Sequence, residues 1–317
     1  MCSKNLTERL DPNATGIARA ASILREGGLV AVPTETVYGL AARADNAEAV
    51  AKIFSAKGRP DFNPLIVHVC DVEMAQRLAQ WDERAAALAA QFWPGPLTIV
   101  LPAAEGTNIV PAIMAGLPTI ALRCPAHRAM HALIEQAGVP LAAPSANRSG
   151  FVSPTSAAHV LETLEGRIDA VVDDGPTERG LESTIVALRD FRGAGGWQLL
   201  RPGPVTREQL VAVLGKDDAV TTQAIEAPGQ LASHYAPGKP MRLGARHGEP
   251  DEFLIGFGNI TGDCTLSASG NLEEAAARLY DCLHQAAADR LPRIAVAPVP
   301  SVGVGVAIND RLKRAAG

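Results

Sequence analysis

The feature of the sequence that most constrains the fold is a change in amino-acid composition between residues 215 and 240. This stretch contains APG at residues 227–229 and HYAPG at residues 234–238, and it has no long apolar period. Segments of this kind commonly join domains. The chain of 317 residues is also longer than one hydrophobic core usually serves. We therefore predict two domains, residues 1–214 and 241–317, joined by a linker at residues 215–240.

Short apolar strands and amphipathic helices follow one another in the first predicted domain without strict alternation. This pattern predicts an α/β domain with a twisted, mixed sheet rather than a doubly wound one. Ser153 followed by Pro154 is typical of a helix N-cap and predicts a helix from there to about residue 164. We expect the other helices at residues 15–25, 47–55, 73–80, 83–91 and 126–136, and strands at residues 29–33, 65–69, 97–101, 119–123, 141–143, 170–173, 183–188 and 197–201.

The second predicted domain is a small α/β unit. We expect its strands at residues 241–244, 252–256 and 293–297, and its helices at residues 272–288 and at the end of the chain. Aromatic residues make up only 4% of the whole chain, so the cores must be built from Ala, Val, Leu and Ile. This composition favours α/β layering over an aromatic-rich β-sandwich.

Charge and cysteine usage limit the classes of function. The formal net charge of −5 argues against indiscriminate binding to nucleic acid, although a local basic cleft for one anion is compatible with it. The five cysteines are dispersed without a C-x-x-C pair, which indicates reduced thiols in a cytosolic protein. There is no apolar signal core near the start and no run of about 18 apolar residues. We therefore expect a cytoplasmic protein.

Polar residues cluster where the predicted strands end, which is where binding groups usually gather. Lys57 and Arg59 would alternate along an extended segment, so that both could reach one cleft and bind a triphosphate. The alternative is a solvated charge pair in a loop. The four clusters are Thr34 with Thr36, Lys57 with Arg59 and Asn63, Ser145 with Asn147, and Ser183 with Thr184 and Arg201.

The sequence lacks several familiar motifs for nucleotide binding, nucleophilic catalysis and metal binding. It has no G-x-x-x-x-G-K-[ST] nucleotide loop, and Ser145 lacks the G-x-S-x-G context of a hydrolase nucleophile. The seven histidines do not fall at metal-binding intervals. His68 could contact a ligand or be an ordinary buried histidine, and Glu35 could be a base or a surface carboxylate. The residues alone indicate a cytosolic α/β protein with a partly basic cleft that binds an anion.

Six sequence blocks, taken together and in their order along the chain, indicate the function more specifically than the single clusters do. They are PTETVYGL at residues 33–40, KGRP with NPLIVH at 57–68, WPGPLT at 93–98, PSANRSG at 144–150, ESTI at 182–185 and LRPG at 200–203. Over roughly residues 14–214 the chain resembles the YrdC-type threonylcarbamoyl-AMP synthases. The later PG and HYAP resemble the linker of the two-domain form of this family, which implies a smaller, Rossmann-like C-terminal domain.

The resemblance implies a reaction between ATP, L-threonine and bicarbonate. Threonine takes up CO₂ to form a carbamate, which attacks the α-phosphate of ATP, giving threonylcarbamoyl-AMP and pyrophosphate. A downstream tRNA threonylcarbamoyl transferase complex would then modify adenosine 37 of ANN-decoding tRNAs. Mg²⁺ would be held mainly through the ATP phosphates and water, without a protein cage.

The resemblance also implies roles for single residues. The family's signature tetrad for the triphosphate corresponds to Lys57, Arg59, Ser145 and Asn147. Its other ATP contacts correspond to Asn63, Thr119, Ser153, Arg201 and Tyr235. Its threonine pocket corresponds to Thr36, His68, Arg123, Ala143 and Ser183, with Arg123 as the partner for the substrate carboxylate.

The linker departs from the family pattern. The family often has basic and aromatic residues in the middle of the linker, whereas this chain reads QLAS at residues 230–233. One alternative function is carbamoyl transfer, as in the related module of hydrogenase maturation proteins, but their zinc-finger cysteines are absent from this sequence. A second alternative is a non-catalytic factor for double-stranded RNA or ribosome maturation, with weak RNA binding. A third is a catalytically inactive relative, which the filled tetrad disfavours.

Overall fold

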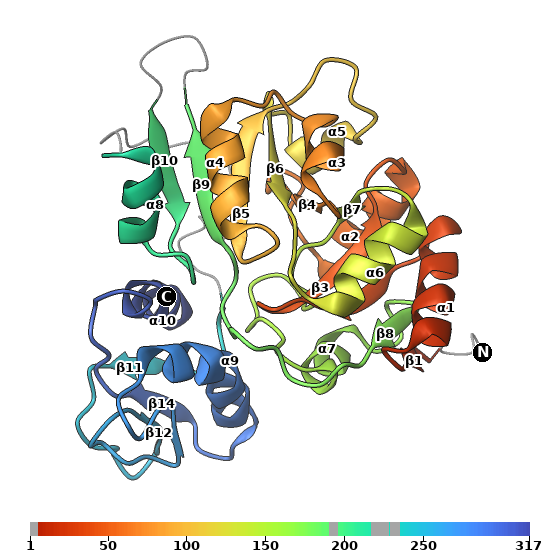
Figure 1. Ribbon diagram of the computed structural model, residues 1–317. Helices are drawn as coiled ribbons and strands as arrows, with labels where there is room; N and C mark the ends of the chain where they lie inside the picture. Colours follow the sequence, from red (N-terminus) through yellow and green to blue (C-terminus); the bar gives the residue numbers. More distant parts are fainter. Residues whose placement is uncertain (1–5, 190–195, 217–227, 229–234) are drawn as a thin grey trace.

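The computed structural model describes residues 6–189, 196–216, 228 and 235–317, which form two sheets with their helices (Figure 1). Most of the predicted linker at residues 215–240 lies outside the described residues, including residues 227 and 229–234 of the resembling segment. No described helix is both long and apolar enough to cross a membrane.

The larger sheet is mixed, as the uneven order of strands and helices predicts. Its order is β1-β8-β2-β3-β7-β4-β6-β5-β9-β10. Four neighbouring pairs are parallel, for example β4 with β6, and the others are antiparallel. The strands are β1 (Glu8–Leu10), β2 (Val30–Pro33), β3 (Tyr38–Arg43), β4 (Ile66–His68), β5 (Leu97–Pro102), β6 (Thr119–Arg123), β7 (Leu141–Ala142), β8 (Ala170–Val172), β9 (Thr184–Leu188) and β10 (Trp197–Arg201).

Helices pack against this sheet and bury their apolar stripes. Asparagine, aspartate, serine and threonine side chains cap six of them by accepting a backbone N–H bond of the first turn. α1 packs against α6 and against β1, β2, β3 and β8. The helices are α1 (Ala14–Arg25), α2 (Ala47–Lys57), α3 (Val72–Gln76), α4 (Glu83–Phe92), α5 (Pro111–Met114), α6 (Arg128–Ala137), α7 (Ala157–Leu164) and α8 (Arg207–Leu214).

The smaller sheet is parallel throughout, in the order β11-β14-β12-β13. Helices α9 (Leu272–Ala288) and α10 (Gly305–Ala316) accompany it, which confirms the small Rossmann-like α/β unit. Its strands are β11 (Met241–Leu243), β12 (Glu252–Gly256), β13 (Cys264–Thr265) and β14 (Arg293–Val296).

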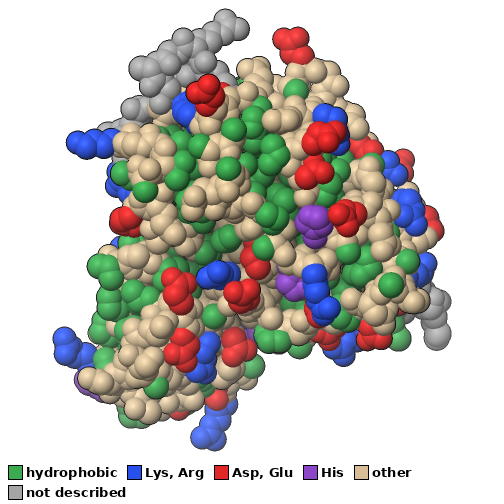
Figure 2. Space-filling view, in the orientation of Figure 1, with side chains coloured by type: hydrophobic (Ala, Val, Ile, Leu, Met, Phe, Trp, Pro, Cys, Tyr) green, Lys and Arg blue, Asp and Glu red, His purple; other side chains and the backbone are tan. Residues whose placement is uncertain are grey.

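The two units share one layer of apolar packing. Val37, Val152 and Leu181 come from the larger unit, yet they belong to the buried cluster that surrounds α9 and α10. In Figure 1, α10 lies below β9, β10 and α8, and α9 lies beside it. On the face drawn in Figure 2, basic and acidic side chains are interspersed over both units. The smaller unit therefore packs directly on the loops of the larger one.

Several local predictions need correction, and three of them matter most here. β3 was not predicted as a strand, because its sequence YGLAAR is rich in Gly and Ala, which have low strand propensity; pairing with β2 and β7 overrides that preference. The helix predicted from Ser153 starts at Ala157 and is capped by Ser156. Lys57 is the last residue of α2 rather than part of an extended segment, because Gly58 ends the helix in the left-handed conformation.

Candidate functional site

One cavity lies where several strands of the larger sheet end. His68 at the end of β4 is in register with Arg123 at the end of the parallel strand β6. Ser183 directly precedes β9, and Arg201 ends β10, which runs antiparallel to β9. The sheet topology therefore brings four polar side chains from distant parts of the sequence to one cavity.

The predicted threonine pocket and part of the predicted ATP site line this same cavity. All five residues of the threonine set contribute to it: Thr36, His68, Arg123, Ala143 and Ser183. From the ATP set, the lining includes Arg59, Ser145, Arg201 and Tyr235. The other five ATP residues lie outside the lining, and their contacts with ATP stay predictions: Lys57, Asn63, Thr119, Asn147 and Ser153.

Lys57 lies behind the cavity wall. Its Nζ donates hydrogen bonds to the backbone carbonyls of Ser145 and Asn147, both at 2.5 Å. Burial, followed by repulsion from Arg59, lowers the pKa of Lys57 well below its usual value. In this arrangement Lys57 fixes the backbone of the Ser145–Asn147 loop.

Arg59 supplies a cation to the cavity. Its Nε and Nη2 donate to the carbonyls of Asn63 and Pro64 at 3.3 and 2.9 Å, while its Nη1 makes no hydrogen bond among the described residues. Burial lowers its pKa to about 10, and Arg201 also lowers it. Arg59 therefore stays charged at neutral pH and has a donor left for an anion.

Three buried side chains beside or in this wall have polar atoms without a partner among the described residues. They are both amide atoms of Asn63, Nδ1 of His68 and Oδ1 of Asn147. Burial lowers the pKa of His68 to about 3, and Arg123 adds to the effect, so His68 is neutral at neutral pH. Buried polar atoms are rarely left unsatisfied in proteins, and such atoms are typical of a site that receives a ligand.

Arg123 forms a buried ion pair with Glu35. Its Nη2 lies 2.7 Å from Glu35 Oε1, and its Nε donates to the Gly95 carbonyl at 3.3 Å. Glu35 is therefore not the surface carboxylate that the sequence left as one alternative; it is only 5% exposed, and Oε2 accepts from the backbone of Ala126. Nη1 of Arg123 has no hydrogen bond among the described residues, so one edge of the guanidinium can still bind a carboxylate.

Hydroxyl groups and a third arginine complete the cavity wall. Ser183 Oγ lies 2.7 Å from Thr98 Oγ1 and accepts from Arg201 Nη2 at 3.1 Å. Arg201 also donates to the Ser183 carbonyl and, through Nη1, to the carbonyl of Pro228 in the linker. Thr36 Oγ1 lies 2.7 Å from Thr34 Oγ1. These contacts hold the wall in place before any ligand arrives.

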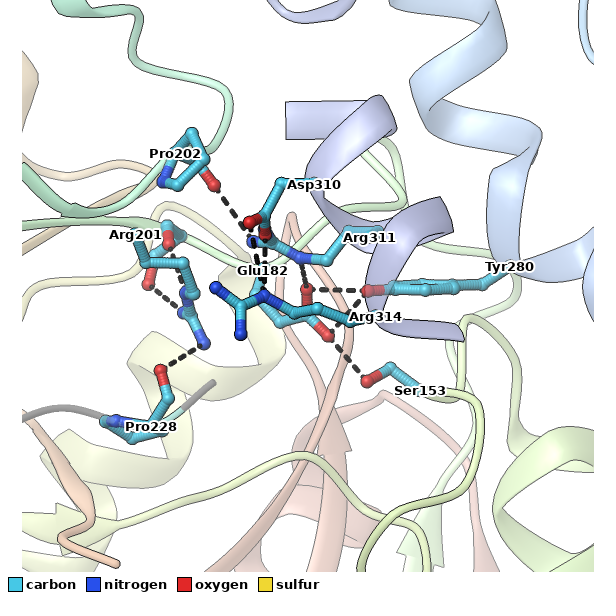
Figure 3. A network of polar contacts seen from close by, with 10 residues as sticks. Ser153, Glu182, Arg201, Pro202, Pro228, Tyr280, Asp310, Arg311 and Arg314 are labelled. Carbon is cyan, nitrogen blue, oxygen red and sulfur yellow. Dashed lines mark hydrogen bonds and ion pairs between the residues drawn. The ribbon is translucent and has the colours of Figure 1, made fainter. Parts of the chain in front are cut away.

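Glu182 is a cavity residue that the sequence analysis missed. It lines the cavity directly before Ser183, and Ser153, predicted as an ATP contact, donates to its Oε1 at 2.5 Å instead of capping a helix (Figure 3). Its other partners, Tyr280 and Arg311, come from α9 and α10. The block ESTI at residues 182–185 was the only sequence signal for it.

Tyr235 closes the cavity from the side of the linker. It is 1% exposed and has a positive φ of 67°, which is uncommon for a residue with a Cβ. Its ring stacks on Tyr280 with centroids 5.6 Å apart, and the Arg311 guanidinium lies 5.4 Å from its centroid. Two residues of the smaller unit therefore hold Tyr235 against the cavity.

Comparison with known proteins agrees with this geometry. Residues 22–203 match the family described as "Telomere recombination", and residues 205–317 match the domain described as "Threonylcarbamoyl-AMP synthase, C-terminal domain". The chain is 41% identical to the threonylcarbamoyl-AMP synthase of Bacillus subtilis, over 99% of this chain and 96% of that protein. The chain belongs to the threonylcarbamoyl-AMP synthase family.

Other members of this family are similar as well. The Schizosaccharomyces pombe threonylcarbamoyl-AMP synthase is 38% identical over 76% of this chain and 66% of its own length. The crystal structure of Pyrococcus abyssi Sua5 complexed with L-threonine superposes with a TM-score of 0.87 at 36% identity, covering 98% of this chain and 97% of that one. Both units of the present fold are therefore shared with a solved two-unit structure.

Proposed function

We propose that this threonylcarbamoyl-AMP synthase family member joins L-threonine, bicarbonate and ATP to form threonylcarbamoyl-AMP. Bicarbonate gives CO₂ and hydroxide, the uncharged threonine amine adds to CO₂ to form a carbamate, and the proton that the amine loses converts the hydroxide to water. A carbamate oxygen attacks the α-phosphorus of ATP, the bond to the bridging oxygen of the β-phosphate breaks, and pyrophosphate leaves. The observation that carries the proposal is one cavity lined by arginines, with unsatisfied neutral polar atoms in and beside its wall.

The end of the cavity at β4 and β6 suits threonine. The free edge of Arg123 would bind the substrate carboxylate, and Glu35 would hold the guanidinium in orientation from its other side. The neutral imidazole of His68 could accept a hydrogen bond from the threonine hydroxyl or amine through Nδ1.

The side of the cavity that contains Arg59 and Arg201 suits the phosphates. The reaction brings a carbamate and a triphosphate together, so it requires fixed positive charge to offset their repulsion. Arg59 would donate to the phosphates through Nη1, and the Ser145–Asn147 loop, fixed by Lys57, would present its polar groups to them. No covalent nucleophile is needed, which supports the reaction without a catalytic triad.

The cavity residues fit Mg²⁺ only as part of its complex with ATP. Among the described lining residues Glu182 is the one carboxylate, and its oxygens already accept hydrogen bonds from three side chains. Magnesium commonly keeps several waters and binds through substrate phosphates. In that complex it would neutralise phosphate charge, while Arg59 and the Ser145–Asn147 loop orient the phosphates.

We further propose that the product is passed to a tRNA threonylcarbamoyl transferase complex that modifies adenosine 37 of ANN-decoding tRNAs in the cytoplasm. The family membership supports this role, and the four described cysteines, all of them free thiols, are compatible with a reducing compartment. The interspersed charges in Figure 2 do not favour RNA as the main ligand of the face drawn there.

Pyrophosphate release tests the reaction. It should require ATP, L-threonine and bicarbonate together, and mass spectrometry should detect threonylcarbamoyl-AMP. Release that proceeds equally well without threonine or without bicarbonate would contradict the proposal. An Arg59→Ala protein should lose most of the release, whereas the Arg77→Ala protein, which loses the same charge at an exposed position directly after α3, should keep it.

A further inference from the structure

We propose that the smaller unit completes the substrate cavity by neutralising Glu182, with Arg311 as the positioning residue that supplies the charge. This inference rests on the proposed function, since it takes the ligands of the cavity to be anions. It gives the C-terminal domain a part in substrate binding and makes Arg311 a determinant of affinity although it lies outside the cavity lining.

Glu182 is an unexpected group in a wall that must receive a triphosphate. It is 6% exposed and lines the cavity with Ser183 and Arg201. Burial by itself raises the pKa of the Glu182 carboxyl, but Arg311, Arg201 and the hydrogen bond from Ser153 lower it to about 2. The carboxylate is therefore charged at every physiological pH, and an uncompensated negative charge there would repel the substrates.

Arg311 provides the direct compensation. Its Nε donates to Glu182 Oε2 at 2.9 Å, its Nη2 donates to the Pro202 carbonyl at 2.9 Å, and its side chain is fully buried (Figure 3). Tyr280 adds hydrogen bonds from its hydroxyl to both oxygens of Glu182, at 3.0 and 2.8 Å. Both residues belong to the smaller unit, on α10 and α9.

Within the described residues, the larger unit has no equivalent partner for Glu182. Its one direct hydrogen bond to the carboxylate comes from Ser153, which is neutral. Arg201 lies near enough to lower the pKa, but its three donor nitrogens are used by Ser183 and Pro228. A wall built from the larger unit alone would thus present a poorly compensated carboxylate to the ligands.

The same two residues also fix the neighbouring part of the wall. Tyr280 stacks on Tyr235, and the Arg311 guanidinium lies over the Tyr235 ring, 5.4 Å from its centroid. Close packing keeps the contact rigid: a Cβ added to Gly180 would lie 2.3 Å from the Ala277 carbonyl of α9. Charge and aromatic packing from one domain therefore reach the cavity of the other.

A charge-rescue experiment tests this role. In an Arg311→Gln protein, the KM for ATP and the Kd of a non-hydrolysable ATP analogue should each rise about tenfold or more. Adding Glu182→Gln to the same chain should bring both values back to within about threefold of the starting protein. Arg311→Lys, which keeps the charge, should retain most of the affinity, and Lys313→Gln, an equal charge change at an exposed position of α10, should have no effect.

The pH profile separates charge from structural support. Without Arg311 the pKa of Glu182 should rise, so affinity for the analogue in Arg311→Gln should improve as pH falls from 8 to 5. The starting protein and the double variant should show no such improvement. Arg311→Gln with normal affinity, or a double variant no better than the single one, would overturn the proposal.

Two further comparisons keep the test decisive. If Arg311→Gln does not fold, the effect of Arg311→Gln is measured in the Glu182→Gln background, where it should be smaller than threefold; a larger loss there would refute the charge role. Analogue binding does not depend on turnover. Charge rescue of binding in a protein that releases no pyrophosphate would therefore reject the proposed function and leave the role of Arg311 intact.

Discussion

The cavity and the junction between the two units both contain buried polar groups, but these groups are satisfied differently. In and beside the cavity, Asn63, His68 and Asn147 have atoms without hydrogen-bond partners among the described residues. At the junction, Glu182 accepts from three side chains, and Arg311 reaches Glu182, Pro202 and Asp310. The difference indicates that the cavity is arranged for an incoming ligand, whereas the junction is arranged for rigidity.

Removing a cavity cation should have the largest effect, and it should fall on activity rather than stability. Arg59→Ala should lower kcat/KM by about 10²- to 10³-fold, because the cation stabilises charge that develops on the phosphates. Its free energy of unfolding should not fall, because the buried guanidinium is poorly compensated in the free protein. Pyrophosphate release and urea unfolding measure the two quantities. If Arg59→Ala lowered the free energy of unfolding as much as it lowered transition-state stabilisation, the proposed difference between the cavity and the junction would be wrong.

Adding a methyl group at the junction should show the opposite behaviour. Gly180→Ala places a Cβ 2.3 Å from the Ala277 carbonyl at a φ of +65°. The matched control is Gly175→Ala, which has a φ of +75° but no atom within 4 Å of the new Cβ. The control should cost about 1 kcal/mol from backbone strain alone, and Gly180→Ala should cost about 1–3 kcal/mol more from overpacking. Equal costs in urea unfolding would mean that the two units do not press on each other at this point.

Two asparagines allow a direct comparison of unsatisfied and satisfied amides. Asn63→Ala should weaken ATP binding about tenfold and change the free energy of unfolding by less than about 1 kcal/mol, since its amide has no partner to lose. Asn309 in α10 donates to Val299, Ser301 and Gly305. Asn309→Ala should therefore cost about 1–2 kcal/mol of stability and leave ATP affinity unchanged. Calorimetric titration measures the ATP affinity, and urea unfolding measures the stability. A loss of stability in Asn63→Ala, or a loss of ATP affinity in Asn309→Ala, would contradict the prediction.

The smallest expected effect concerns pH and a histidine pair at the junction. His159 of α7 stacks on His284 of α9 with centroids 3.8 Å apart, and Asp281 lies 3.7 Å from His159 Nε2. Burial, and then His284, lower the pKa of His159 to about 4. The unfolded chain thus binds a proton at higher pH than the folded protein does, so stability should decrease as pH falls from about 6.5 to 4.

The His159→Gln protein should lose less stability between pH 7 and pH 5 than the starting protein. The titration of Glu182 does not affect this comparison. Because its pKa is about 2 in the folded protein, its contribution to the free energy of unfolding changes only below about pH 4.5. The exposed His247→Gln protein should behave like the starting protein. Identical pH slopes in all three proteins would show that His159 titrates normally.

Local patterns in the sequence predicted most elements and the mixed sheet, because apolar periodicity is a local signal. β3 was missed because Gly39, Ala41 and Ala42 are poor strand formers, and partners about 100 residues away in β7 override that preference. Lys57 was placed in an extended segment because the sequence does not show whether Gly58 ends a helix or continues a loop.

For the site, the resemblance predicted the residues whose types are set by ligand chemistry. All five threonine-pocket residues share the observed cavity. The role of Glu182 could not be read in the same way, since it depends on Arg311, which lies 129 residues later. Likewise, the spacing of Glu35 and Arg123 gives no sign that they pair. Contacts between separate elements depend on packing, which no local pattern records.

The distance along the chain between Glu182 and Arg311 has a consequence for synthesis. At about 5–20 residues per second, a ribosome needs on the order of ten seconds to add the residues that separate them. During that time the larger unit emerges without the Arg311 and Tyr280 contacts to Glu182 and with Val37, Val152 and Leu181 uncovered. If Arg311 acts as proposed, a nascent or prematurely terminated chain should bind ATP poorly, and nucleotide consumption should begin only when the last helix has docked.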